Sequence, residues 1–208
     1  MKHLQAFELR EDIRTVPNLL TLSRIVLTPA IGWLIVQGSH GWALLAFGVA
    51  GFTDLLDGWI ARRFSQQTIL GTVLDPAADK ILMTTLTISL WWGALLPGWL
   101  TVLIIGRDVG LVLGAFYVRW ISLEPPKTLS RYWDVTLPSA EVRPTRVSKV
   151  NTAFQLALMG VSLASGIWDF QDWIGMDAFR IIVGTTTVWS GAQYLLANNS
   201  VKILRKLK

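Results

Sequence analysis

Four aspartates lie close together in a part of the chain that is otherwise apolar. Asp54, Asp57, Asp75 and Asp79 all fall within residues 54–79, DLLDGWIARRFSQQTILGTVLDPAAD. A charged side chain at membrane depth costs about 2.5 to 3.5 kcal/mol on insertion scales, so four of them need a compensating partner. Carboxylate oxygens are hard ligands that suit Mg²⁺ or Mn²⁺. The residue types therefore predict a site for a divalent cation.

The spacing of these aspartates indicates how such a site would be built. Asp54 and Asp57 are three residues apart, and Asp75 and Asp79 are four apart, so each pair lies on one face of a helix. Two helices joined by the polar turn 63–68 can aim both pairs at one point. Neighbours on the same stripes continue the pattern: Gly58, Ala61 and Arg62 after the first pair, and Gly71 one turn before the second. The small residues leave room for a flat group beside the backbone.

A simpler interpretation stays open at this point. Single carboxylates near helix ends often cap helices or pair with neighbouring cations, here Arg62, Arg63 and Lys80. Four carboxylates at this spacing, with small residues on the same stripe, favour the functional interpretation.

Eight positions in this segment form the pattern D-x2-D-G-x2-A-R-x8-G-x3-D-x3-D: Asp54, Asp57, Gly58, Ala61, Arg62, Gly71, Asp75 and Asp79. The pattern resembles that of the CDP-alcohol phosphatidyltransferase family. The resemblance implies that Asp54, Asp57 and Asp75 bind two divalent ions, Mg²⁺ or Mn²⁺, and that Asp79 assists them and acts as the general base. It also implies a cytidine nucleotide beside Asp57 and the residues Gly58, Ala61, Arg62 and Gly71.

The composition predicts a polytopic membrane protein. The 208-residue chain has eleven tryptophans and a mean hydropathy of +0.46. Six segments are long enough to span a bilayer. They are residues 18–36, 42–62, 74–93, 98–119, 148–168 and 177–197. The expected fold is all-α, one membrane domain of six transmembrane helices over residues 1–208.

Basic residues test this topology independently. If the six segments alternate, one side receives the N-terminus, the turn after Arg62, the loop 120–147 and the C-terminal tail, which together hold most of the Lys and Arg. The positive-inside bias then predicts both termini on that side, together with the aspartates. The net charge of +5 suits anionic lipid headgroups. Nucleic acid is not an expected partner, because no nucleic-acid-binding motif is present.

The N-terminal segment 1–17 is too polar to cross a membrane, and we expect a short interfacial helix there. It contains Glu8, Glu11 and Asp12, whereas transit peptides avoid acidic residues, so it is not an intact presequence. The chain has no cysteine, which excludes thiolate metal sites and disulfides.

Further polar residues stand inside or beside the predicted helices. The opening PNLLTLSR also resembles the family, which implies that Asn18 and Arg24 border the nucleotide site. Arg107, near mid-membrane, is a functional candidate by its position. The alternative for Arg107 is an ion pair with Asp108 that locks helices together.

The loop 120–147 is the longest connection and carries four prolines, so no long helix is expected to run through it. Its aromatic residues Tyr132 and Trp133 favour an ordered loop on the membrane surface, on the active side. Arg143, Arg146 and Lys149 cluster where it enters the next helix. They form either a solvated, lipid-anchoring face or, with Arg107, a site for the phosphate of the acceptor.

The stretches RYWDVTLPSAEVRPTRVSKVNTAFQL and VPNLLTLSRIVLTPAIGWLI narrow the resemblance to the eukaryotic mitochondrial cardiolipin synthases of this family. It implies transfer of a phosphatidyl group from CDP-diacylglycerol to phosphatidylglycerol, a homodimer, and a mitochondrial inner membrane with the site on the matrix side. Two alternatives stay open: a phosphatidylglycerophosphate synthase that uses glycerol 3-phosphate, and an ion-coupled membrane transporter.

Overall fold

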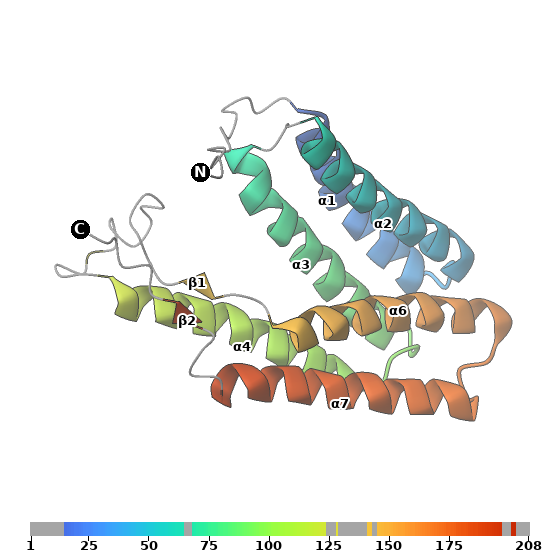
Figure 1. Cartoon of the computed structure of the whole chain (residues 1–208). Coiled ribbons are helices and arrows are strands. Elements are labelled where there is room, and N and C mark those ends of the chain that lie inside the picture. The colour runs from blue at the N-terminus through green and yellow to red at the C-terminus, as the bar shows by residue number, and fades with distance from the viewer. Residues whose placement is uncertain are drawn as a thin grey trace. The chain divides into compact units, whose positions relative to one another are not determined.

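The structure is a computed structural model, and it describes residues 15–64, 68–123, 128, 141–142, 145–196 and 201–202. The described part contains six long helices (Figure 1): α1 (Val16–Val36), α2 (His40–Arg63), α3 (Ile69–Trp92), α4 (Gly98–Ser122), α6 (Arg146–Trp168) and α7 (Ile174–Leu196). Two short strands, β1 (Glu141–Val142) and β2 (Val201–Lys202), pair antiparallel. The all-α class is confirmed, and each helix overlaps one predicted segment.

The largest boundary difference is at the start of α3. The hydropathy pattern predicts a helix from residue 74, but α3 begins five residues earlier, at Ile69. Thr68 is its N-cap, and the Thr68 hydroxyl accepts a hydrogen bond from the backbone N–H of Gly71 at 2.9 Å. Residues 69–73, ILGTV, therefore belong to α3, and the Thr68 cap marks its start. Helix α4 ends at Ser122, three residues later than predicted, so the first residues of the predicted loop 120–147 are helical.

Four of the described helices are long and apolar enough to cross a membrane: α1, α2 as far as Ala61, α4 and α6. Large apolar side chains on these helices are exposed, with Val26 at 75%, Trp42 at 68% and Val102 at 72%. Lipid is the solvent that accommodates such surfaces. The chain is therefore an integral membrane protein.

The described chain forms two compact units. The first contains α1, α2 and α3 together with the last part of α6, residues 159–168. Helix α1 packs against both α2 and α3, and Ile31, Ile35 and Leu86 form part of its core, each at most 1% exposed. Gly38, with φ of 74°, makes the turn from α1 to α2 in a backbone conformation that favours glycine.

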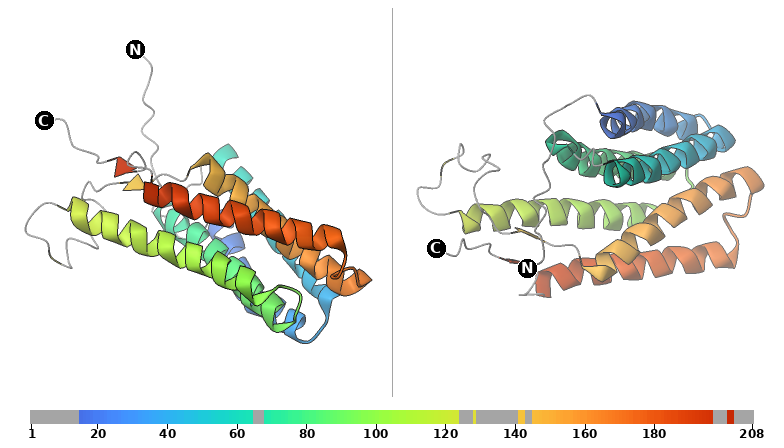
Figure 2. Two further views of the ribbon diagram at one scale, coloured as in Figure 1. Left: turned by 90° about the horizontal axis from the view of Figure 1, so that it is seen from below. Right: turned by 45° about the horizontal axis from the view of Figure 1, so that its top comes forward.

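The second unit contains α4, α7 and the first part of α6, residues 146–158. Helices α4 and α7 lie side by side (Figure 2). Leu100, Ile104 and Val183 are buried in this unit, each at most 2% exposed. The strand pair also belongs here, with Glu141 opposite Lys202.

Two predicted features lie mostly outside the described residues. They are the interfacial helix within residues 1–17 and the loop 120–147. Both stay predictions.

Candidate active site around Arg24

One face of α1 carries polar side chains into the first unit. Thr21, Arg24 and Thr28 recur at three- and four-residue spacing, so they form a single stripe on the helix. Each is buried, with at most 1% of its surface exposed. Because α1 packs against α2 and α3, this stripe faces the two helices that carry the four aspartates.

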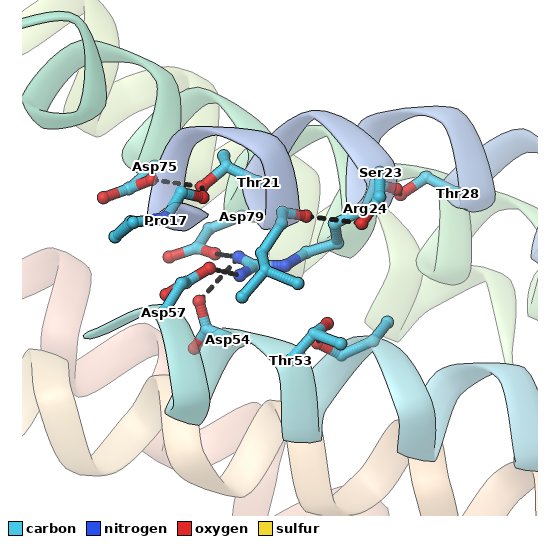
Figure 3. A network of polar contacts seen from close by, with 12 residues as sticks. Pro17, Thr21, Ser23, Arg24, Thr28, Thr53, Asp54, Asp57, Asp75 and Asp79 are labelled. Atoms are coloured by element: carbon cyan, nitrogen blue, oxygen red, sulfur yellow. Dashed lines mark hydrogen bonds and ion pairs between the residues drawn. The ribbon is translucent and has the colours of Figure 1, made fainter. Parts of the chain in front are cut away.

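The guanidinium of Arg24 binds three of these aspartates (Figure 3). Its Nη1 lies 2.6 Å from Oδ1 of Asp54 and 2.9 Å from Oδ1 of Asp79, and its Nη2 lies 2.6 Å from Oδ2 of Asp57. Helix α2 supplies Asp54 and Asp57, and helix α3 supplies Asp79. The structure thus confirms that the two helices aim carboxylates from both pairs at one point.

The fourth aspartate is held by a different residue of α1. The hydroxyl of Thr21 lies 2.7 Å from Oδ1 of Asp75 and 3.1 Å from the carbonyl oxygen of Pro17. Its single proton goes to the carboxylate, because a hydrogen bond to a charged acceptor is the shorter and stronger one. Asp75 therefore lies beside the Arg24 cluster with its orientation fixed by Thr21 (Figure 3).

The side chains of the cluster differ in their access to solvent. Arg24 is 1% exposed and Asp57 is 6% exposed, whereas Asp54 and Asp79 are 46% and 58% exposed. The cluster thus has a buried floor made by Arg24 and Asp57 and an open side made by the other two. Small ligands reach the carboxylates from the open side.

Next to the cluster, Asn18 fixes the start of α3. The hydroxyl of Thr68 donates to Oδ1 of Asn18 at 2.9 Å, and Thr68 caps the backbone of Gly71. A Cβ atom at Gly71 would lie 2.9 Å from Oδ1 of Asn18 and 3.0 Å from the Thr68 hydroxyl oxygen. Glycine is therefore required at 71 for the close approach of α3 to α1. The structure brings Asn18 and Gly71 together, and their place in a nucleotide site stays a prediction.

The carboxylates suit a cation by their chemistry. Three of them converge on a single positive group, and one guanidinium supplies one positive charge to three negative ones. Within the described residues, no three acidic or histidine side chains are arranged as a metal site as they stand. The guanidinium of Arg24 occupies the point where the carboxylates converge, which is where a metal ion would bind. The donor set fits divalent ions that prefer oxygen ligands.

The remaining residues of the predicted nucleotide site lie on the last turns of α2. Gly58 and Ala61 are partly exposed there, one and two turns from Asp54. Arg62 belongs to the same helix, and its side chain lies outside the described part of the structure. These positions follow the stripe expected from the spacing.

Arg107 lies in the second unit, in a polar cluster of its own. Its Nη1 pairs with Oδ1 of Asp108 at 2.8 Å, and its Nη2 donates to the hydroxyls of Ser148 at 2.5 Å and Ser190 at 2.9 Å. The ion pair with Asp108 is present, but both residues lie on α4, so the pair itself does not lock helices together as the alternative expected. Helices α4, α6 and α7 all contribute to this cluster, so Arg107 also holds the unit together.

The other predicted acceptor residues are less fully described. Arg146 and Lys149 lie on the first turn of α6, and both are exposed. Arg143 lies outside the described residues.

Sequence reasoning missed the cluster's hydrogen-bond partners. From the sequence, helix capping explains Thr21 about as well as a functional role does, and Thr68 and Ser190 were not singled out. The expected ion-pair partners were the near neighbours Arg62, Arg63 and Lys80, whereas Arg24 holds three of the aspartates. A signal was present for Thr21, because it lies one turn before Arg24 on the same helical stripe.

Comparison with known proteins adds independent evidence. The sequence profile of the CDP-alcohol phosphatidyltransferase family matches residues 14–190. A protein from Drosophila melanogaster named probable cardiolipin synthase (CMP-forming) is 49% identical over 203 residues, covering 96% of this chain and 62% of that protein. The human cardiolipin synthase (CMP-forming) is 43% identical over 187 residues, covering 89% of this chain and 62% of that protein.

A relative with a different name is less similar. The chloroplastic CDP-diacylglycerol–glycerol-3-phosphate 3-phosphatidyltransferase 1 of Oryza sativa is 35% identical over 193 residues, covering 89% of this chain and 57% of that protein. The chain thus spans between 57% and 62% of the length of these three relatives. No solved structure matches the chain. The profile match covers the whole aspartate pattern and most of the described helices, and the chain belongs to the CDP-alcohol phosphatidyltransferase family.

Proposed function

We propose that this protein transfers a phosphatidyl group from CDP-diacylglycerol to phosphatidylglycerol, giving cardiolipin and CMP. The observation that carries the proposal is the convergence of Asp54, Asp57 and Asp79 on one point, with Asp75 beside them, in a chain of this family. Family membership favours a transferase over an ion-coupled transporter, because the matched residues include all four aspartates.

The proposed cofactors are two divalent ions, Mg²⁺ or Mn²⁺. Asp54, Asp57 and Asp75 are the proposed ligands, and Asp79 assists them. Three carboxylates around one guanidinium, open to solvent on one side, support this assignment. When bound, the ions neutralise the diphosphate of the donor lipid and stabilise the charge on departing CMP.

The chain's own residues then have separate tasks. Asp79 is the proposed general base, since its side chain is 58% exposed on the open side of the cluster, where an incoming hydroxyl arrives. Asn18 and Gly71 form the tight contact between α1 and α3 beside the proposed nucleotide site. Arg107, Arg143, Arg146 and Lys149 are the proposed residues for the acceptor's phosphate.

The acceptor is proposed from the named relatives. Identity is 49% and 43% to two proteins named cardiolipin synthase, against 35% to the rice protein named for glycerol 3-phosphate. That last relative keeps glycerol 3-phosphate as the second candidate acceptor. A lipid acceptor enters sideways from the membrane, and the loop 120–147, with Tyr132 and Trp133, has the interfacial composition that suits this entry.

The test is an assay of the purified protein with CDP-diacylglycerol, Mg²⁺ or Mn²⁺, and each alcohol in turn, with lipid products identified by mass. We expect cardiolipin from phosphatidylglycerol in strong preference to phosphatidylglycerophosphate from glycerol 3-phosphate. In the same assay, Lys149→Ala is expected to raise the KM for the acceptor more than that for CDP-diacylglycerol. Greater activity with glycerol 3-phosphate would replace the cardiolipin proposal with the second candidate.

Two further properties belong to the proposal. We propose a mitochondrial inner membrane, as the resemblance to the eukaryotic mitochondrial cardiolipin synthases implies, and the positive-inside bias would then put the aspartates on the matrix side. We also propose a homodimer, as the family resemblance implies.

A further inference from the structure

Each charged partner that the structure gives Arg24 is one of the aspartates proposed to hold divalent ions. The contacts use Oδ1 of Asp54, Oδ2 of Asp57 and Oδ1 of Asp79, at 2.6 to 2.9 Å. These are the carboxylate oxygens that converge on the centre of the cluster (Figure 3). A divalent ion held at that centre would therefore compete with the guanidinium for these oxygens.

The two cations also repel each other at this range. Two positive charges that share ligands lie only a few ångströms apart, and burial of Arg24 at 1% exposure limits the screening by water. Ion binding consequently favours a position of the guanidinium further from the carboxylates. Because Asp54 and Asp79 are half-exposed, ions can arrive from the open side, opposite the buried floor.

The hydrogen bonding of Arg24 is incomplete in the arrangement seen. Its Nε is buried and has no hydrogen-bond partner within the described structure. A buried N–H without a partner costs free energy, so this arrangement does not satisfy all the donors of the side chain. An anion that accepted from the Nε and Nη groups together would satisfy them better, since guanidinium favours bidentate phosphate contacts.

We propose that Arg24 is an exchangeable counter-ion of the aspartate cluster. It pairs with Asp54, Asp57 and Asp79 when no divalent ion is bound, and divalent ions displace it toward the diphosphate of the donor lipid. This inference rests on the proposed function for the identity of both ligands. It makes Arg24 a competitor of the ions and, once they are bound, a partner of the substrate.

Competition has a measurable consequence at equilibrium. Removing the positive charge of Arg24 takes away the competitor, so the affinity for divalent ions must rise. The same change leaves three neighbouring carboxylates without their counter-ion, so the ion-free protein must become less stable. A purely structural role for Arg24 predicts lower stability together with unchanged or weaker ion binding.

The experiment compares the whole purified chain with Arg24→Gln and Arg24→Lys in detergent. Mn²⁺ binding is measured by electron paramagnetic resonance of the free ion. Thermal unfolding is followed by tryptophan fluorescence, in EDTA and in saturating Mn²⁺. The matched control is Arg180→Gln, because Arg180 also pairs with an aspartate, Asp177, at 2.8 Å, but belongs to α7 in the second unit and contacts none of the four aspartates in the contacts described.

We expect Arg24→Gln to bind Mn²⁺ about tenfold more tightly than the parent, within the range of ordinary coupling between sites. In EDTA, the Tm of Arg24→Gln should lie below that of the parent. Saturating Mn²⁺ should raise the Tm of Arg24→Gln by more than it raises that of the parent. Arg24→Lys keeps the charge and should bind Mn²⁺ like the parent. Arg180→Gln should leave the Mn²⁺ affinity unchanged.

Two results would overturn the inference. If Arg24→Gln stays folded in EDTA and binds Mn²⁺ no more tightly than the parent, the guanidinium and the ion do not compete. If Arg24→Gln does not fold in EDTA, the Arg24→Lys protein decides. Competition by charge predicts that Arg24→Lys binds Mn²⁺ with the affinity of the parent. A purely structural role for the guanidinium predicts that it binds Mn²⁺ more weakly. A parent that binds no Mn²⁺ would overturn the ion assignment and this inference together.

The second half of the proposal has its own measurement. In saturating Mn²⁺, Arg24→Gln should bind CDP-diacylglycerol more weakly than the parent. Unchanged binding would show that Arg24 does not contact the diphosphate. A parent that shows the competition but forms no cardiolipin would contradict the proposed reaction and leave the competition standing.

Discussion

Asp79 has the most exposed side chain of the three aspartates that contact Arg24, at 58% against 46% for Asp54 and 6% for Asp57. If it is the general base, Asp79→Asn should lower kcat by about 10² to 10⁴, because asparagine keeps the shape but accepts no proton at neutral pH. Binding of CDP-diacylglycerol should change far less. The measurement is CMP release under saturating lipid, with binding followed separately.

The control for this prediction is Asp177→Asn, which neutralises an exposed aspartate on α7. It should leave kcat within a small factor of the parent. An Asp79→Asn protein whose kcat also stays within about tenfold of the parent would show that another group takes the proton.

Thr21 provides a second test at the residue scale. Thr21→Val removes the hydroxyl that donates to Asp75 at 2.7 Å and keeps the shape of the side chain. Groups that orient a ligand commonly change metal affinity by about 10- to 100-fold, so we expect the Kd for Mn²⁺ to rise by such a factor. Thr21→Ser keeps the hydroxyl and should restore most of the affinity. Equal affinities for the Val and Ser proteins would contradict a role for this hydrogen bond.

The sequence predicts the residues of the cluster better than their partners. The aspartate spacing is local, so the helical period alone puts each pair on one face. The partners are remote, because Arg24 and Thr21 lie 30 to 55 residues from the carboxylates that they bind. No local rule links them, and the nearby cations Arg62, Arg63 and Lys80 were the natural alternative.

At the scale of helices, hydropathy finds the elements but not all their ends. Each of the six described helices overlaps a predicted segment, since apolar length is the dominant signal in membrane sequences. The start of α3 was missed because it depends on Thr68, whose hydroxyl caps the helix and bonds Asn18 of α1. A cap of this kind is a tertiary contact, and it adds no apolar residue to the pattern.

Gly71 tests how closely α3 must approach α1. Gly71→Ala would place a Cβ atom 2.9 Å from Oδ1 of Asn18 and 3.0 Å from the Thr68 hydroxyl oxygen, closer than real contacts allow. Asn18 is 3% exposed and bonded to Thr68, so it has little freedom to move. We expect a loss of about 1 to 3 kcal/mol in stability, as for other overpacked sites, together with reduced activity.

Gly110→Ala is the matched control for Gly71→Ala. Gly110 lies within α4, and a Cβ atom there would meet nothing within 4 Å. Alanine is the better helix former by about 0.5 to 1 kcal/mol, so this change should keep or slightly raise the Tm. If both alanine variants unfold at the temperature of the parent, the contact at Gly71 is not restrictive.

At the scale of the whole molecule, the charge pattern makes the strongest prediction. Helix α2 ends with Arg62 and Arg63, and the loop 120–147 contains further Lys and Arg, whereas the turn between α1 and α2 has none. The turn between α6 and α7 carries Asp169 and Asp172. The positive-inside bias therefore places the two groups of loops on opposite sides of the membrane, with the aspartate cluster on the basic side. Six crossings are required for this alternation.

Single cysteines can test this topology without background, because the chain has none of its own. We expect Ser39→Cys, between α1 and α2, and Gln171→Cys, between α6 and α7, to react with an impermeant thiol reagent from one side of sealed vesicles. Thr128→Cys, which follows α4 and is exposed, should react only from the other side or after permeabilisation. Each variant must first retain the transferase activity of the parent, so that the labelling reports on the active fold.

The pair formed by Gln171 and Thr128 decides between topologies. Helix α6 separates them, together with the remainder of the loop 120–147. If α6 crosses the membrane, the two cysteines must label from opposite sides, and its hydropathy is high enough for it to cross. Labelling of both from the same side would leave an odd number of crossings and put the two termini on opposite sides. The basic tail would then lie away from the aspartates, contrary to the positive-inside bias.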